Sequence, residues 1–243
     1  MNKITNTSYI KSAAVLFFLL SAFTNYAQDS SANRYGLLVI ASDSAYHATV
    51  KKDSNKKMVD LKKSLPGLVF ELRYAGKNNF TGFLLYPVLN TTYLRKPVAM
   101  ALSIVQKDLK KQGLGLKIFD AYRPYAVTEK MWELVKNEWY AANPKTGSGH
   151  NRGISVDLTI INLQTKQPLK MGTDFDNFTD TAHHNFTALS KEILQNRLLL
   201  RTHMEKNGFK ALETEWWHYS FITEDVYELL DIIFDDLAKR KTK

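Results

Sequence analysis

Residues 148–161 read Ser-Gly-His-Asn-Arg-Gly-Ile-Ser-Val-Asp-Leu-Thr-Ile-Ile, and this stretch holds the most informative pattern in the chain. From residue 154 onward, apolar side chains alternate with small or polar ones, which is typical of a strand. Asp157 stands out, because an ionised carboxylate inside an apolar strand must be paired or bound to a metal. The stretch therefore predicts a glycine-rich loop over 147–153, a strand over 154–161 and a partner for Asp157.

Two histidines are candidate partners of Asp157. His150 lies seven residues earlier, across the glycine-rich loop, which allows its ring to fold back over the strand. His218 lies in a second apolar strand and is flanked by aromatic residues at positions 216, 217 and 219. Two imidazoles and one carboxylate leave one position of a tetrahedral zinc ion open, as in catalytic rather than structural zinc sites. Glu215 is then the candidate acid and base of such a site.

Each of these residues also has a simpler interpretation. A histidine beside tryptophans is more often a hydrogen-bonded core residue, and Asp157 could accept hydrogen bonds from turn amides. Glu215 could be a solvated strand end. Because Glu215 lies three residues before His218, a regular strand would put the two on opposite faces. The metal-site hypothesis therefore requires a turn or a bulge between them.

The rest of the chain mixes helices and strands without a regular alternation. Pro97 opens a helix whose apolar residues recur at 98, 102, 105 and 109, and Gly113 ends it. Further helices are predicted over 126–141, over 190–207 before Gly208, and from Thr223 to the C-terminus. Strands are predicted over 36–41, 68–74, 116–119, 154–161 and 216–221. This mixture predicts an α+β fold with a largely antiparallel central sheet and helices packed on one face.

The N-terminal residues predict a targeting segment. Lys3 and Lys11 precede the apolar run 13–20, and small and polar residues follow as far as Ala27. This pattern is typical of a secretory signal peptide over 1–27, and an uncleaved membrane anchor is the alternative. Residues 28–56 are interpreted as an N-terminal segment with a surface linker over 43–57, and residues 57–243 as the catalytic domain. We accordingly expect an exported, periplasmic protein with no stable membrane insertion after signal cleavage.

Composition limits the kinds of site that the protein can hold. Its 243 residues are 44% hydrophobic, which is enough for one well-filled domain. The chain has no cysteine, so disulfides and thiolate metal ligands are excluded, and any metal must be held by histidines and carboxylates. The formal charge of +9 is scattered and lacks a basic stripe with interleaved aromatic residues, so no nucleic-acid partner is expected.

The motifs resemble a known family. The pattern Ser-x-His-x-x-Gly-x-small-x-Asp over 148–157, together with Glu-Trp-Trp-His over 215–218, resembles the D-alanyl-D-alanine dipeptidases of the VanX type. These belong to the wider lysostaphin/D-alanyl-peptidase/hedgehog group of zinc folds. Further matches, in the same order, are Arg-Tyr-Ala at 73–75, Asn-Phe-Thr-Gly at 79–82, Asp-Ala-Tyr-Arg-Pro at 120–124 and Met-Gly-Thr-Asp-Phe-Asp at 171–176. The resemblance covers residues 57 to 222.

The resemblance implies a role for each matching residue. It makes His150, Asp157 and His218 the ligands of one zinc ion per chain and Glu215 the general base and acid. Arg123 matches the arginine that stabilises the developing oxyanion. A permanently charged fork suits that task, although the simpler interpretation is a salt-bridged surface arginine.

The remaining matches concern substrate binding. Asp176 matches the carboxylate that holds the substrate's ammonium group, Ser148 a residue that helps to hold the dipeptide, and Tyr74 a tyrosine of the pocket. The chain departs from the family at Ser155, where alanine is more usual.

The implied activity is zinc-dependent hydrolysis of the small dipeptide D-alanyl-D-alanine to two D-alanines, in cell-wall peptide metabolism. One alternative is a D,D-carboxypeptidase or endopeptidase of the same zinc group that acts on peptidoglycan stem peptides. A more distant alternative is a non-enzymatic binding module that keeps the metal fold, against which the presence of Glu215 and Arg123 argues. The sequence does not indicate an oligomeric state.

Overall fold

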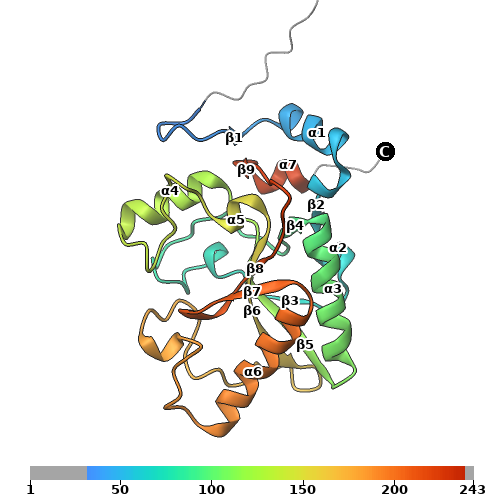
Figure 1. The fold of residues 1–243 in the computed structure, drawn as a ribbon, viewed down its shortest axis with the longest axis vertical. Coiled ribbons are helices and arrows are strands. Elements are labelled where there is room, and N and C mark those ends of the chain that lie inside the picture. The colour runs from blue at the N-terminus through green and yellow to red at the C-terminus, as the bar shows by residue number, and fades with distance from the viewer. Residues whose placement is uncertain (1–31, 239–243) are drawn as a thin grey trace, which may run out of the picture.

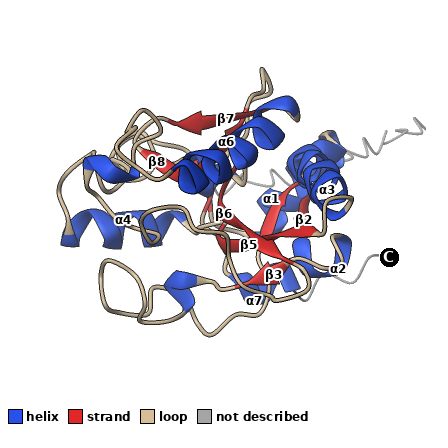
Figure 2. Ribbon diagram, turned by 90° about the horizontal axis from the view of Figure 1, so that it is seen from below, coloured by secondary structure: helices blue, strands red, loops and turns tan. Residues whose placement is uncertain are grey.

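The computed structural model describes residues 32–238, so the predicted signal peptide over 1–27 lies outside the described residues. A five-stranded sheet runs through the centre of the molecule (Figures 1 and 2). In spatial order its strands are β3 (Val69–Phe70), β5 (Leu114–Asp120), β6 (Ser155–Asn162), β8 (Glu215–Phe221) and β7 (Phe209–Leu212). β3 pairs with β5 in parallel, and every other pair is antiparallel. The predicted α+β class and largely antiparallel sheet are confirmed.

Two long helices pack on this sheet and contact each other. They are α3 (Lys96–Lys110), which packs on β5, and α6 (Lys191–Lys206), which packs on β7 and β8. The apolar positions predicted for the first helix, at 98, 102, 105 and 109, are all fully buried. Gly113 and Gly208, which follow these two helices, have positive φ angles of 73° and 83°. Glycine adopts such angles without strain, so both predicted helix ends are confirmed.

Two predictions for the other helices and one for a loop are wrong. α4 (Tyr125–Leu134) ends at Leu134 rather than at residue 141. The predicted loop at 147–153 contains a short helix, α5 (Gly149–Arg152), because Ser148 and Asn151 form a capping box. No helix starts at Thr223, whose hydroxyl instead accepts a hydrogen bond from the Asp225 amide two residues later. The chain then forms β9 (Leu229–Leu230) and reaches a helix only at α7 (Phe234–Ala238).

The segment before residue 57 is not a surface linker, and that prediction is wrong. Residues 43–57 form α1 (Asp43–Lys52) and a 3-10 turn, η1 (Ser54–Lys56). Tyr46 of α1 is buried, and its hydroxyl accepts a 2.6 Å hydrogen bond from the Met58 amide. Tyr46 thus fixes α1 on the domain, and Ala45 and Val50 of the same helix also pack against the core. β1 (Val39–Ile40) pairs in parallel with β9, which joins the two ends of the described chain.

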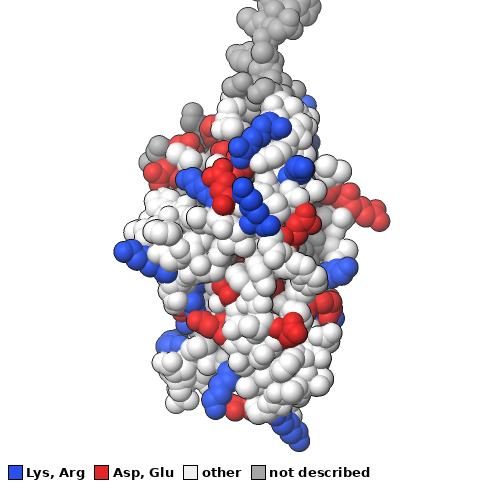
Figure 3. Space-filling view, turned by 90° about the vertical axis from the view of Figure 1, so that its left-hand side faces the viewer, with Lys and Arg blue, Asp and Glu red and all other residues white. Residues whose placement is uncertain are grey.

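The remaining elements are short, and all but one of them lie before residue 96. They are β2 (Met58–Asp60), α2 (Leu61–Ser64), η2 (Arg73–Ala75), β4 (Tyr93–Arg95), which pairs with β2, and later η3 (Asp180–Ala182). Across residues 32–238, no helix combines the length and the apolar character needed to span a bilayer. On the face shown in Figure 3, basic and acidic side chains are interspersed rather than separated into fields of one sign.

Candidate metal and catalytic site

Asp157 and His218 are direct partners across the antiparallel pair β6–β8. Directly opposite residues in such a pair point to the same face of the sheet, so the carboxylate and the imidazole project together. Asp157 is 3% exposed and its Oδ1 lies 2.9 Å from His218 Nδ1. The partner that the sequence required for this buried carboxylate is therefore a histidine on the neighbouring strand.

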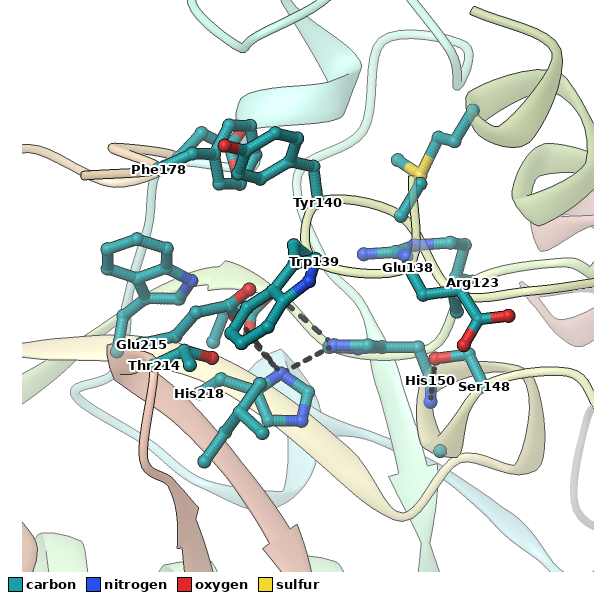
Figure 4. Close-up of a pocket in the computed structure, with 18 of the residues that line it drawn as sticks. Arg123, Glu138, Trp139, Tyr140, Ser148, His150, Phe178, Thr214, Glu215 and His218 are labelled. Carbon is teal, nitrogen blue, oxygen red and sulfur yellow. Dashed lines mark hydrogen bonds and ion pairs between the residues drawn. The ribbon is translucent and has the colours of Figure 1, made fainter. Parts of the chain in front are cut away.

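His150 completes a cluster of three candidate ligands (Figure 4). Its Nε2 lies 3.4 Å from Asp157 Oδ2 and 3.2 Å from His218 Nδ1. Bonds of 2.0–2.2 Å to a tetrahedral ion would separate the ligand atoms by roughly 3.2–3.6 Å. The three donors fit one such ion closely. Burial alone would raise the pKa of Asp157, but the two imidazoles hold this pKa well below its ordinary value.

The short helix α5 holds His150 in this orientation. Ser148 Oγ accepts a hydrogen bond from the His150 amide, and Gly153 ends the helix in the left-handed conformation with φ 72°. The imidazole Nδ1 donates to the carbonyl oxygen of Ala121 at 2.6 Å. With the proton on Nδ1, the lone pair of Nε2 points into the cluster, which is the arrangement that metal-binding histidines require.

Glu215 reaches the cluster because β8 is irregular. The pairing between β7 and β8 jumps from Ala211–Tyr219 to Leu212–Glu215, so residues 216–218 have no directly paired partners on β7. This irregularity is the bulge that the sequence argument required, and it brings Glu215 Oε2 to 3.9 Å from His218 Nδ1. Burial raises the pKa of the Glu215 carboxyl to about 7, with His218 opposing this shift and Asp157 adding to it. A carboxyl with this pKa can both take up and release a proton near neutral pH.

Arg123 is not the salt-bridged surface arginine of the simpler interpretation. It is 6% exposed, and its Nη2 donates to Asp120 Oδ2 at 2.8 Å. The hydroxyl of Tyr86 donates to the other oxygen of Asp120, and the Arg123 guanidinium lies over the Tyr74 ring, 5.1 Å from its centre. A bulge in β5 brings Asp120 opposite Asp157. Asp120 was not predicted as a site residue, although it precedes Arg123 in the motif at 120–124.

Asp176 lies on the wall of a cavity that the three candidate ligands also line. Its backbone has φ 58°, a left-handed conformation that aspartate tolerates better than most residues. Its Oδ1 accepts a 3.0 Å hydrogen bond from the Tyr74 hydroxyl, and its Oδ2 accepts one from the Phe80 amide at 3.3 Å. Burial raises the pKa of this carboxyl to about 8, and the charge of Asp157 adds to the shift. The site therefore holds a carboxylate that lacks a cationic partner among the described residues.

One cavity of about 670 Å³ connects these groups. All eight residues singled out in the sequence line it: Tyr74, Arg123, Ser148, His150, Asp157, Asp176, Glu215 and His218. Their individual roles stay predictions. Figure 4 shows Glu215, His150 and His218 directed toward one another, with Arg123 and Ser148 on the same side of the pocket as His150.

Three aromatic residues at the cavity's edge were not predicted. Trp139, 68% exposed, and Tyr140 come from the chain after α4, and the Tyr140 ring lies 4.5 Å from that of Phe178. The sequence places none of the three in a motif. Trp139 and Tyr140 fall within the predicted helix over 126–141, but α4 ends at Leu134, so both lie in an irregular segment beside the cavity.

Several known proteins resemble this chain over most of its length. The peptidase M15 family model, described as D-ala-D-ala dipeptidase, matches residues 54–236. The D-alanyl-D-alanine dipeptidase of Escherichia coli K12 is 33% identical over 173 residues, which are 71% of this chain and 89% of that protein. The enzyme of the same name from Enterococcus faecalis is 32% identical over 186 residues, 68% of this chain and 91% of that protein. A solved structure of the LD-carboxypeptidase LdcB is 19% identical, with a TM-score of 0.39 over 68% of this chain and 67% of that one.

Proposed function

The chain belongs to the M15 family of D-alanyl-D-alanine dipeptidases, and on that premise we propose that it is a zinc-dependent enzyme that hydrolyses D-alanyl-D-alanine to two D-alanines. One observation carries the proposal. His150, Asp157 and His218 converge at ion-binding distances, with Glu215 beside them in a cavity that also exposes Asp176.

The donor set suits a single zinc ion. Two imidazole nitrogens and one carboxylate oxygen form the ligand set of many catalytic zinc sites, and the cluster borders the cavity, so that His150, Asp157 and His218 would hold an ion within reach of a substrate. When bound, such an ion supplies Lewis acidity that polarises a peptide carbonyl and acidifies water. The buried carboxylate of Asp157 would also balance part of its charge.

Glu215 is the residue that moves the proton. Its carboxylate takes a proton from the attacking water at Oε1 or Oε2 and then gives it to the nitrogen of the leaving D-alanine. Burial raises the pKa of this carboxyl, which suits both transfers, because a group with a pKa closer to neutral pH can act as base and then as acid.

Arg123 faces the charge that develops on the carbonyl oxygen during attack. Its guanidinium is fixed by Asp120 and lies against the Tyr74 ring, so it is already oriented before the reaction starts. Preorganised donors of this kind stabilise a transition state without a reorganisation cost. Ser148, which caps α5, lines the same side of the cavity and is proposed to help hold the dipeptide.

Asp176 is proposed to select free dipeptides. A substrate ammonium group would provide the cationic partner that its carboxylate lacks, and the Tyr74 hydroxyl and the Phe80 amide hold the carboxylate in place. An N-acylated peptide has no such cation, so the charge-assisted hydrogen bond between the substrate and Asp176 would be lost. This is the physical basis for preferring the dipeptidase over the carboxypeptidase or endopeptidase.

The proposed setting is outside the cytoplasm. The basic flank and the apolar run within residues 1–27 support export to the periplasm, where D-alanyl-D-alanine could arise from cell-wall peptides. Expression of the full chain followed by cell fractionation and N-terminal sequencing of the mature protein tests this. Retention of the intact N-terminus in the cytoplasm would contradict it.

The activity is tested by three substrates with and without a chelator. We expect hydrolysis of D-alanyl-D-alanine, little hydrolysis of L-alanyl-L-alanine or N-acetyl-D-alanyl-D-alanine, loss of activity with a chelator and recovery with zinc. Preferred hydrolysis of the acetylated compound would favour the carboxypeptidase. Failure to hydrolyse all three would favour the non-enzymatic binding module.

A further inference from the structure

A second polar pair lies next to the candidate metal site on the same two strands. Along the β6–β8 ladder, Ser155 pairs with Ser220 two positions away from the pair of Asp157 and His218. Residues two apart on a strand point to the same face, so all four side chains lie on one surface of the sheet. The sequence marked Ser155 as a departure from the family, and the structure places it beside this site.

The two hydroxyls form a chain of hydrogen bonds that ends on His218. Ser155 Oγ lies 2.7 Å from Ser220 Oγ, and Ser220 Oγ lies 3.2 Å from His218 Nε2. Ser155 is fully buried. A Cβ atom built on Gly149 would lie 2.0 Å from Ser155 Oγ, so the start of α5 covers this hydroxyl closely. Neither serine lines the cavity, so a substrate there would not touch them.

The two nitrogens of the His218 ring face different partners. Nδ1 faces Asp157 and His150, and Nε2 faces Ser220. To offer a lone pair to an ion at Nδ1, a neutral imidazole must carry its proton on Nε2. That N–H is then a buried donor, and an acceptor for it stabilises this tautomer and the ring orientation.

We propose that Ser220, itself oriented by Ser155, is a positioning residue that accepts a hydrogen bond from the Nε2–H of His218 when Nδ1 binds the ion, and thereby strengthens metal binding at His150, Asp157 and His218. The Nε2–H donates to Ser220 Oγ, and the Ser220 hydroxyl donates onward to Ser155 Oγ. This inference rests on the metal site of the proposed function but not on the identity of the substrate.

A purely structural role for the two serines is the competing explanation, since cross-strand hydroxyl pairs also stabilise sheets. The two explanations differ in what a substitution changes. A structural pair would alter the free energy of unfolding and leave metal affinity and the His218 Nε2–H signal of the zinc-loaded protein as they are. A positioning pair would alter both the affinity and this signal even in a folded protein.

The experiment uses the full chain and zinc alone as the probe. Zinc affinity is measured by competition with a chromophoric chelator for the wild type, Ser220→Ala, Ser220→Thr and Ser155→Ala. Removal of a group that orients a metal-binding histidine typically weakens affinity 10- to 100-fold, and we expect about this loss for Ser220→Ala. Ser220→Thr keeps the hydroxyl and should stay within about threefold of the wild type, with Ser155→Ala between the two.

A second readout is spectroscopic. In the zinc-loaded protein, the Nε2–H proton of His218 should give a hydrogen-bonded, slowly exchanging nuclear magnetic resonance signal in the wild type, and this signal should shift and exchange faster in Ser220→Ala. Ser103→Ala is the matched control, because the Ser103 hydroxyl is exposed and donates only to the Met100 carbonyl within α3. It should change neither quantity.

The outcomes separate this inference from the proposed function. Wild-type zinc affinity in a folded Ser220→Ala variant, or an unchanged His218 Nε2–H signal in its zinc-loaded form, would overturn the inference even if D-alanyl-D-alanine is hydrolysed. Weakened zinc binding in Ser220→Ala supports it even if that dipeptide proves not to be the substrate.

Discussion

The hydroxyl of Tyr74 donates a 3.0 Å hydrogen bond to Oδ1 of Asp176, across 102 residues of sequence. Tyr74 lies in η2 and Asp176 in the segment after β6, so the bond ties two irregular segments to each other. The ring of Tyr74 also lies beneath the Arg123 guanidinium. One tyrosine thus contacts both the group proposed to bind the substrate's ammonium and the group proposed to face its carbonyl.

The first prediction concerns substrate affinity. Asp176→Asn keeps the shape of the side chain, and asparagine also tolerates a positive φ, but the substitution removes the negative charge. We expect kcat/KM for D-alanyl-D-alanine to fall about 10- to 100-fold, mainly through KM, because a charge-assisted pair is lost. The preference over the N-acetylated dipeptide should shrink as well. Steady-state kinetics on both substrates check this, with Asp180→Asn, a nearby and 91% exposed carboxylate, as control.

The second prediction concerns the stability of the metal-free protein. The pKa of Asp176 rises from 3.8 to about 8 on folding, so between these values the folded state binds more protons than the unfolded one. The protonated carboxyl therefore contributes stability at low pH that is lost as pH rises toward 8. Relative to the wild type, Asp176→Asn should gain stability over this window, on the order of 1–3 kcal/mol by pH 8.

Urea unfolding of both proteins at pH 5 and pH 8, with a chelator present, measures this difference. A pH-independent difference between the two proteins would mean that Asp176 ionises normally in the fold. The same comparison with zinc present should give a smaller effect, because a bound cation would offset the charge of Asp157 that adds to the shift.

Much of the site followed from local sequence chemistry. The apolar strand around Asp157 predicted a buried carboxylate with a partner, and the need for Glu215 to share a face with His218 predicted the irregularity in β8. Helices α3 and α6 followed from the apolar repeat and from the glycines that end them. The helices could be predicted because the residues that define them are close in sequence. The site could be predicted because a buried carboxylate requires a partner.

Other features depend on contacts that no local pattern encodes. α1 has one buried residue, Tyr46, so its sequence shows no amphipathic repeat and was taken for a linker. Thr223 resembles a helix cap, but its hydroxyl bonds the Asp225 amide in a local turn. Asp120 has an evident role only when the bulge in β5 and the positions of Tyr86 and Arg123 are known.

The third prediction concerns an ion pair that holds the Asp176 segment. Arg73 is 8% exposed, and its Nη2 and Nη1 donate to the two carboxylate oxygens of Asp174 at 2.8 and 3.3 Å. Its guanidinium also lies 5.0 Å from the centre of the Phe119 ring. Arg73→Met should loosen the segment that carries Asp176 and raise KM several-fold with a smaller change in kcat. Kinetics and hydrogen–deuterium exchange of residues 172–178 check this.

Asp174→Ala breaks the same pair from its exposed side and should cost only about 1 kcal/mol of stability, because a solvated pair is screened. It should still increase exchange at residues 172–178. Glu192→Ala, which breaks the exposed pair between Lys170 and Glu192, is the matched control and should leave this exchange unchanged. If Arg73→Met, Asp174→Ala and Glu192→Ala all exchange at residues 172–178 as the wild type does, the ion pair between Arg73 and Asp174 does not hold this segment.

The fourth prediction separates proton transfer from metal binding. Glu215→Gln keeps the size of the side chain but removes the group that exchanges a proton. We expect kcat for D-alanyl-D-alanine to fall roughly 10²- to 10⁴-fold, the usual range for the loss of a general base, with zinc content near the wild-type value. Metal analysis and kinetics on the same preparation check both quantities. Glu213→Gln, which alters an exposed carboxylate paired with Arg201, should remain active.

The reason to expect retained zinc is geometric. Glu215 Oε2 lies 3.9 Å from His218 Nδ1, whereas the distances among the atoms of the three-residue cluster are 2.9–3.4 Å. Glu215 therefore lies beside the donor set rather than within it, and its loss removes no ligand. Loss of zinc together with activity in Glu215→Gln would make it a fourth ligand and leave the reaction without its base. Near-normal turnover with zinc bound would assign the proton transfer to another group.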